Sequence, residues 1–191
     1  MDFLLDLLQG VGIAAAIGIR PFLPVLLAGA LAIANLGLDF DGTDFSFLEQ
    51  WWFLAAVLVV VLAVDAVVRR GESAPVVWLL LGIAVVLGAL EAAGSLADRG
   101  HPIVAGIVAG AAAATLGFYA ARSLFGRVRR RLDTEAQAFL PLYGEVAALV
   151  AAGVSILFPP LAILVLAGLG WLLAGGRRRA GEKYAGLRIL R

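Results

Sequence analysis

The chain of 191 residues has no cysteine, one histidine and few charged residues. The absence of cysteine excludes disulfides, thiolate metal sites and cysteine nucleophiles. The histidine, His101, precedes a proline in a loop with no second ligand type beside it, so no metal or other cofactor is expected. Only 15% of the residues are charged and 62% are apolar, whereas roughly a quarter of a soluble domain is charged. The composition predicts an integral membrane protein.

Common catalytic and nucleotide-binding motifs are also missing. The sequence contains no HExxH, GxSxG or Walker A pattern. The catalytic motifs expected of an intramembrane hydrolase are therefore missing. The net charge is only +1. Neither an enzyme nor a nucleic-acid-binding protein is predicted.

Six apolar runs approach the length of about 20 residues that a membrane-spanning helix needs. They cover roughly residues 7–34, 48–68, 75–97, 102–121, 138–157 and 159–175. The expected fold is all-α: a compact bundle of about six transmembrane helices in one domain, residues 1–176, followed by a basic cytoplasmic tail, residues 177–191. Because the last run is short, a re-entrant hairpin over residues 138–175 is an alternative.

The basic residues predict an orientation, because Lys and Arg accumulate in cytoplasmic loops. With six spans, thirteen of the fifteen basic residues fall on the side of the C-terminal tail. We therefore predict both termini inside and the acidic loop from Asp39 to Glu49 outside. No basic residue lies near the N-terminus, so an N-out first segment that re-enters the membrane satisfies the same charges. The tail is expected to contact the bilayer and its anionic lipid headgroups.

The first apolar run contains one charge, Arg20, between glycine and proline residues. Pro21 and Pro24 each lack an N–H and clash with the preceding helical turn, so the sequence predicts a first helix that is broken at Arg20-Pro21. An arginine near mid-bilayer costs roughly 2.5 kcal/mol or more. Arg20 therefore needs a compensating group, and the break should face protein or water.

Three carboxylates lie within the other apolar runs. Asp65 is one turn before Arg69, and an ion pair that reaches the interface explains it. Glu91 and Glu145 lie deeper, and each is either a proton carrier or a fixed counter-ion. We predict that Arg20 pairs with Glu145, and next with Glu91. Arg20 is equally open to a structural and to an anion-binding interpretation.

Two further patterns have no predicted chemistry. Gly106, Gly110 and Gly117 lie on one face of the fourth run and predict close helix packing. The stretch from Asp39 to Thr43 matches the DxDGT loop of haloacid-dehalogenase-type phosphatases, but it follows a membrane helix rather than a buried strand. A solvated acidic loop is expected there, with a weak surface cation site from Asp39, Asp41 and Asp44 as an alternative.

The segment from Gly12 to Pro24, the acidic residue Asp65, and the Gly144-Glu145 helix followed by Pro159-Pro160 resemble a bacterial membrane family called domain of unknown function 4126. The most specific part is Gly-x-Arg-x-Phe-x-Pro at residues 18–24. That family tends to have glutamate in its second span, where this chain has aspartate. The resemblance implies a compact, multi-pass protein of the bacterial inner membrane, and no settled activity.

Two functions remain in view. The first is a small transporter, translocase or channel with a mid-membrane polar site for an anionic or lipid-linked substrate; its pathway residues would be Arg20, Pro21, Pro24, Asp65, Glu91 and Glu145. The second is a non-transporting assembly or lipid-binding protein whose buried charges fix helix packing. A homo-oligomer is compatible with either function. A hydrated cavity that reaches Arg20 would favour the first, and a dry, fully paired ion cluster the second.

Overall fold

A computed structural model describes residues 2–68, 73–97 and 99–185, and in these ranges the fold is helical, with no strand. The α helices are α1 (Asp2–Ile19), α2 (Leu23–Ile33), α3 (Trp51–Val68), α4 (Ala74–Ala97), α5 (Ile103–Arg129), α6 (Thr134–Leu157) and α7 (Ala162–Ala185). Two short 3-10 helices, η1 (Ser46–Glu49) and η2 (Pro159–Leu161), precede α3 and α7.

Three helices of the described chain are long and apolar enough to cross a membrane: α4, α5 and α6. This agrees with an all-α membrane protein but not with six full spans. The first run is divided by its prolines into helices of 18 and 11 residues, which at 1.5 Å per residue are only about 27 and 17 Å long. The apolar parts of α3 and α7 are also shorter than a full span.

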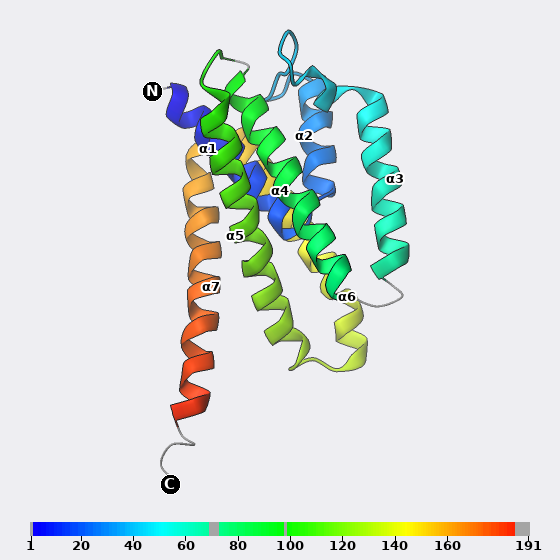
Figure 1. The fold of residues 1–191 in the computed structure, drawn as a ribbon, viewed down its shortest axis with the longest axis vertical. Coiled ribbons are helices and arrows are strands. Elements are labelled where there is room, and N and C mark those ends of the chain that lie inside the picture. Colours follow the sequence, from blue (N-terminus) through cyan, green and yellow to red (C-terminus); the bar gives the residue numbers. More distant parts are fainter. Residues whose placement is uncertain (1, 69–72, 98, 186–191) are drawn as a thin grey trace.

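The predicted break of the first helix is confirmed. α1 ends at Ile19 and α2 begins at Leu23. Figure 1 shows that α1 runs from one end of the bundle into its middle, and that α2 returns towards the same end. The two helices therefore form a hairpin whose tip is Arg20-Pro21-Phe22. Prolines cause the interruption, because neither Pro21 nor Pro24 donates a backbone hydrogen bond.

The start of α1 and the last described turns of α7 lie at opposite ends of the bundle (Figure 1), and the membrane topology stays a prediction. The start of α1 is close to the connection between α2 and α3, where the Gln9 side chain donates to the carbonyl oxygen of Gly37. Gln9 also donates to Ile156 at the end of α6, at 3.1 Å. The last turns of α7 lie at the opposite end of the bundle (Figure 1). The re-entrant alternative fits this arrangement, because the first hairpin turns back inside the bundle.

The centre of the bundle is α1, which packs against α4, α5, α6 and α7. Small side chains permit this close packing: Ala14, Ala15 and Ala16 are completely buried. A Cβ atom on Gly117 would collide with the carbonyl oxygen of Ala15, and one on Gly106 would collide with that of Ala92. Helix backbones are therefore in direct contact around α1.

The last two helices are antiparallel and joined by η2. α6 has 24 residues, which is long enough to span. α7 continues past residue 176 to Ala185, so the helix extends through the first part of the predicted tail. Residues 186–191 lie outside the described chain.

α3 is the least integrated helix. Its main neighbours are η1 and α2, and Figure 1 shows it at the side of the bundle. Large apolar side chains such as Leu58, Val59 and Leu62 are exposed along it. In a bilayer these side chains face lipid, which is as apolar as they are.

Candidate functional site

The tip of the α1–α2 hairpin exposes backbone groups that a continuous helix would satisfy. Because Pro21 and Pro24 have no N–H, the carbonyl oxygens of Ile17 and Arg20 cannot accept the usual bond from four residues ahead. α2 begins after Phe22, which supplies no side-chain cap. The N-terminus of α2, with its first N–H groups and the positive end of the helix dipole, therefore lies at the hairpin tip.

Arg20 pairs with Glu145, as predicted. Arg20 Nε lies 3.6 Å from Glu145 Oε1, and the two side chains are 34% and 31% exposed. Glu145 is near the middle of α6, and the neighbouring Gly144 leaves room for Arg20: a Cβ there would lie 3.0 Å from Arg20 Nε. The distance is longer than the 2.7–2.9 Å of a strong charge-assisted hydrogen bond. The pair is loose and accessible.

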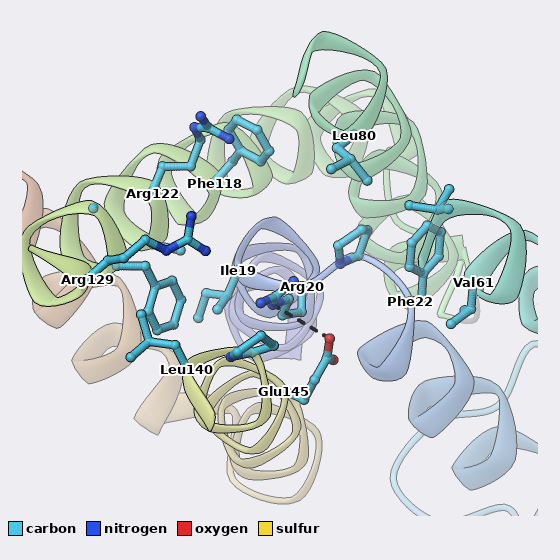
Figure 2. A pocket seen from close by; sticks show the side chains of 16 residues that line it. Ile19, Arg20, Phe22, Val61, Leu80, Phe118, Arg122, Arg129, Leu140 and Glu145 are labelled. Atoms are coloured by element: carbon cyan, nitrogen blue, oxygen red, sulfur yellow. Dashed lines mark ion pairs between the residues drawn. The ribbon is translucent and has the colours of Figure 1, made fainter. Parts of the chain in front are cut away.

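A pocket of about 390 Å³ surrounds this pair. Its walls come from the hairpin tip and from α3, α4, α5 and α6 (Figure 2). Its lining residues are Ile19, Arg20, Pro21, Phe22, Val61, Val64, Leu80, Phe118, Ala121, Arg122, Phe125, Gly126, Arg129, Leu140, Pro141 and Glu145.

One face of α5 brings two more arginines to the pocket. Phe118, Arg122, Phe125 and Arg129 follow one another at spacings of four, three and four residues, which places them on the same side of a helix. Arg122 lies over the ring of Phe118, with the guanidinium carbon 5.7 Å from the ring centroid. Sequence reasoning counted Arg122 and Arg129 only as markers of orientation. The signal available in the sequence was that these two arginines share one helix face with two phenylalanines.

The charge of the pocket favours an anion. Among the described residues, its lining holds three arginines, at positions 20, 122 and 129, and one carboxylate, Glu145. These described lining residues carry two more positive than negative charges, and the N-terminus of α2 adds a partial positive charge at the same place. Arginine presents planar sets of N–H donors that match carboxylate and phosphate oxygens. The site can therefore bind an anion by geometry as well as by charge.

The remaining predicted pathway residues do not line this pocket, or their side chains are not among the described residues. Pro24 is buried in the core and does not line the pocket. Asp65 belongs to α3, and its side chain lies outside the described residues. Glu91 is fully buried in α4, and neither of its carboxylate oxygens has a hydrogen-bond partner in the described chain. The nearby Ser95 hydroxyl instead donates to the backbone carbonyl of Glu91, at 3.0 Å.

The predicted packing glycines lie at helix contacts, away from the pocket. Gly106 and Gly110 face the backbone of α4, and Gly117 faces that of α1. Added Cβ atoms would meet carbonyl oxygens at all three positions. These glycines hold α5 close enough for Arg122 and Arg129 to reach the hairpin tip.

A second charged cluster, which sequence reasoning missed, joins the start of α1 to the connection between α4 and α5. Arg99 Nη1 lies 2.6 Å from Asp6 Oδ1, and His101 Nε2 lies 3.5 Å from Asp6 Oδ2. Asp6 is almost completely buried, whereas Arg99 is half exposed. The His101 ring also packs edge-on against Phe3. The available signals were Asp6 directly before the first apolar run and Arg99, the one arginine or lysine predicted on the outer side, with His101 in the loop that follows it.

The acidic loop caps the same end of the bundle. Carboxylate oxygens of Asp39, Asp41 and Glu49 lie within 4.8 Å of one another, and Asp44 of the predicted cation site is not in this group. The backbone N–H of Phe40 donates to Glu49, at 3.4 Å. Burial, followed by a hydrogen bond that the protonated Glu49 carboxyl donates to Asp41, raises the pKa of Glu49. The Phe40 side chain is fully buried, so the DxDGT-like stretch serves as a lid on the core.

Comparison of the chain with models of protein families, with curated proteins and with solved structures finds no match. The resemblance carried by residues 12–24 therefore stays an expectation, and the site must be interpreted from its own geometry.

Proposed function

We propose that this protein is a small membrane transporter or translocase that binds an anionic substrate at the Arg20 pocket. The observation that carries the proposal is that Arg20, Arg122 and Arg129 line one accessible pocket, in which Glu145 is the one carboxylate among the described residues. Charges that merely fix packing are expected to be buried and closely paired, whereas Arg20 and Glu145 are about one-third exposed and 3.6 Å apart.

Glu145 acts in this proposal as the resident counter-ion of the empty site. Its carboxylate keeps Arg20 from being an isolated charge in the membrane. An arriving anion competes with Glu145 for the guanidinium, so Glu145→Gln should tighten anion binding because it removes the competing negative charge. Arg20→Gln should weaken anion binding.

Binding of inorganic phosphate and sulfate to the purified protein in detergent tests the proposal, with calorimetry as the readout. Arg20→Gln, Arg122→Gln and Arg129→Gln should each weaken binding roughly tenfold, since a hydrogen bond to a charged group contributes about 1.5–3 kcal/mol. Arg130→Gln and Arg131→Gln are matched controls, because these residues directly follow the end of the same helix but do not line the pocket. Equal effects of pocket and control variants would overturn the proposal.

The proposed orientation places the end that carries Arg127–Arg131 in the cytoplasm of a bacterial cell, because basic residues gather on that side. The start of α1 and the acidic loop then face outside. The cysteine-free sequence allows single cysteines to be labelled without background. A membrane-impermeant maleimide should label Thr43→Cys in intact cells, and Arg131→Cys only after the membrane is opened. The reverse pattern would invert the orientation.

A further inference from the structure

The pocket has two kinds of wall. Arginines and Glu145 occupy the side formed by α1, α5 and α6, while the described side chains of the opposite side are apolar and include Phe22, Val61, Val64 and Leu80. Figure 2 shows Leu80, Phe22 and Val61 across the pocket from Arg129. A small hydrophilic anion would contact only the charged side of the pocket and would leave the apolar wall uncovered.

The apolar wall comes from the hairpin tip and from α3 and α4. Val61 and Val64 belong to α3, which packs mainly on α2 and η1, and Leu80 belongs to α4. The outer faces of the same two helices carry exposed apolar side chains, such as Val59 and Leu79. In the hydrocarbon region of a membrane, lipid chains rather than water surround such faces.

A ligand that satisfies both walls is amphiphilic. Its anionic head meets the charged wall and the N-terminus of α2, and its hydrocarbon part lies against the apolar side chains of α3 and α4. Phosphate suits the head because arginine binds it through paired N–H groups, and because helix N-termini bind phosphate oxygens. Such a molecule would move only its polar head from the headgroup region into the pocket, while its chains would stay in hydrocarbon.

We infer that the pocket takes the phosphate ester headgroup of a membrane lipid, whose chains lie against the apolar wall formed by Phe22, Val61, Val64 and Leu80. This inference rests on the proposed anion site and narrows its substrate to a lipid. The charged wall selects the phosphate, and the apolar wall lets the chains remain in hydrocarbon.

The test compares three probes with the purified protein in detergent: dioctanoyl phosphatidic acid, glycerol phosphate and dioctanoyl glycerol. Native mass spectrometry and thermal unfolding measure their binding. Phosphatidic acid should bind at least roughly tenfold more tightly than glycerol phosphate, since two buried methylene groups already contribute about that factor. Dioctanoyl glycerol, which lacks the phosphate, should bind weakly.

Two sets of variants separate the head from the chains. Arg20→Gln and Arg129→Gln should weaken binding of both phosphate probes. Val61→Trp and Leu80→Trp, which fill the apolar side, should weaken phosphatidic acid binding roughly tenfold and leave glycerol phosphate binding unchanged. Val59→Trp is the matched control, because Val59 is 65% exposed on α3 and does not line the pocket.

The outcomes distinguish the two proposals. If glycerol phosphate binds through the arginines as tightly as phosphatidic acid, and the tryptophan variants change nothing, the lipid inference is wrong and the anion site stands. If neither phosphate probe depends on the arginines, both proposals are wrong, and any lipid bound is only part of the surrounding lipid shell.

Discussion

The two ends of α1 each carry an ion pair to another part of the bundle, and the two pairs are built in opposite ways. At the start, Asp6 is 3% exposed and lies 2.6 Å from Arg99, with His101 close by. At the end, Arg20 and Glu145 are about one-third exposed and lie 3.6 Å apart. The first pair has the burial and geometry of a structural tie. The second has the space and the surplus charge of a binding site.

Glu91 supplies a third case, in which a carboxyl is buried without any partner among the described residues. It lies in α4, on the part of the bundle where backbones touch, and it does not line the pocket. The comparison teaches that burial alone does not mark the functional charge in this chain. The accessible pair is the better candidate, because a substrate can reach it.

The largest expected effect is at the tight pair. Arg99→Ala leaves the buried Asp6 carboxylate without its guanidinium partner and should lower the free energy of unfolding by about 3 kcal/mol. Asp6→Asn should cost less, because the half-exposed Arg99 left behind can be hydrated. Unfolding in mixed detergent micelles measures both variants, and Arg131→Ala, at an exposed position, is the control. Equal, small losses in all three would show that the tie at Asp6 is not structural.

Glu91 offers the next effect, with the opposite sign. Glu91→Met replaces an unsatisfied buried carboxyl with an apolar side chain of similar size and should raise the free energy of unfolding by about 1–2 kcal/mol. Glu145→Met is the matched control and should give no gain, because Glu145 is paired and partly exposed. The same unfolding assay decides the outcome. A loss of stability in Glu91→Met would mean that this carboxyl has a stabilising partner after all.

The loose pair should show weak coupling. A double-mutant cycle of Arg20→Ala and Glu145→Ala should give an interaction energy of about 0.5 kcal/mol, because exposed ion pairs contribute little. Thermal and detergent unfolding of the two single variants and the double variant measure this energy. A coupling as strong as that expected for Asp6 and Arg99 would move Arg20 into the structural class and weaken the proposed function.

The smallest effect concerns the acidic loop at the outer end of the bundle. The folded-state pKa of Glu49 is raised, so between its unfolded and folded pKa values the native protein binds more protons than the unfolded one. Stability should therefore fall as pH rises through this window, and Glu49→Gln should reduce the slope. Melting temperatures across pH measure it, with Asp44→Asn as the control. An unchanged slope in Glu49→Gln would contradict the prediction.

Several features were determined by the sequence alone, because their causes are local or compositional. Proline at positions 21 and 24 interrupts a helix wherever it is placed, since both residues lack the donor that the helix needs. The need of Arg20 for an acidic partner follows from the cost of a charge in hydrocarbon, and Glu145 is that partner. The glycines of α5 likewise indicated close packing before any neighbour was known.

Other features depend on distances between helices, which only the tertiary structure decides. The hairpin of α1 and α2 returns to its starting end because the two short helices pack inside the bundle, and apolar length alone could not distinguish this from a full span. Arg122 and Arg129 join Arg20 only because α5 packs beside α1. Asp6 finds Arg99 across 93 residues of chain, and Glu91 faces no partner among the described residues, because neighbouring helices fix what each side chain meets.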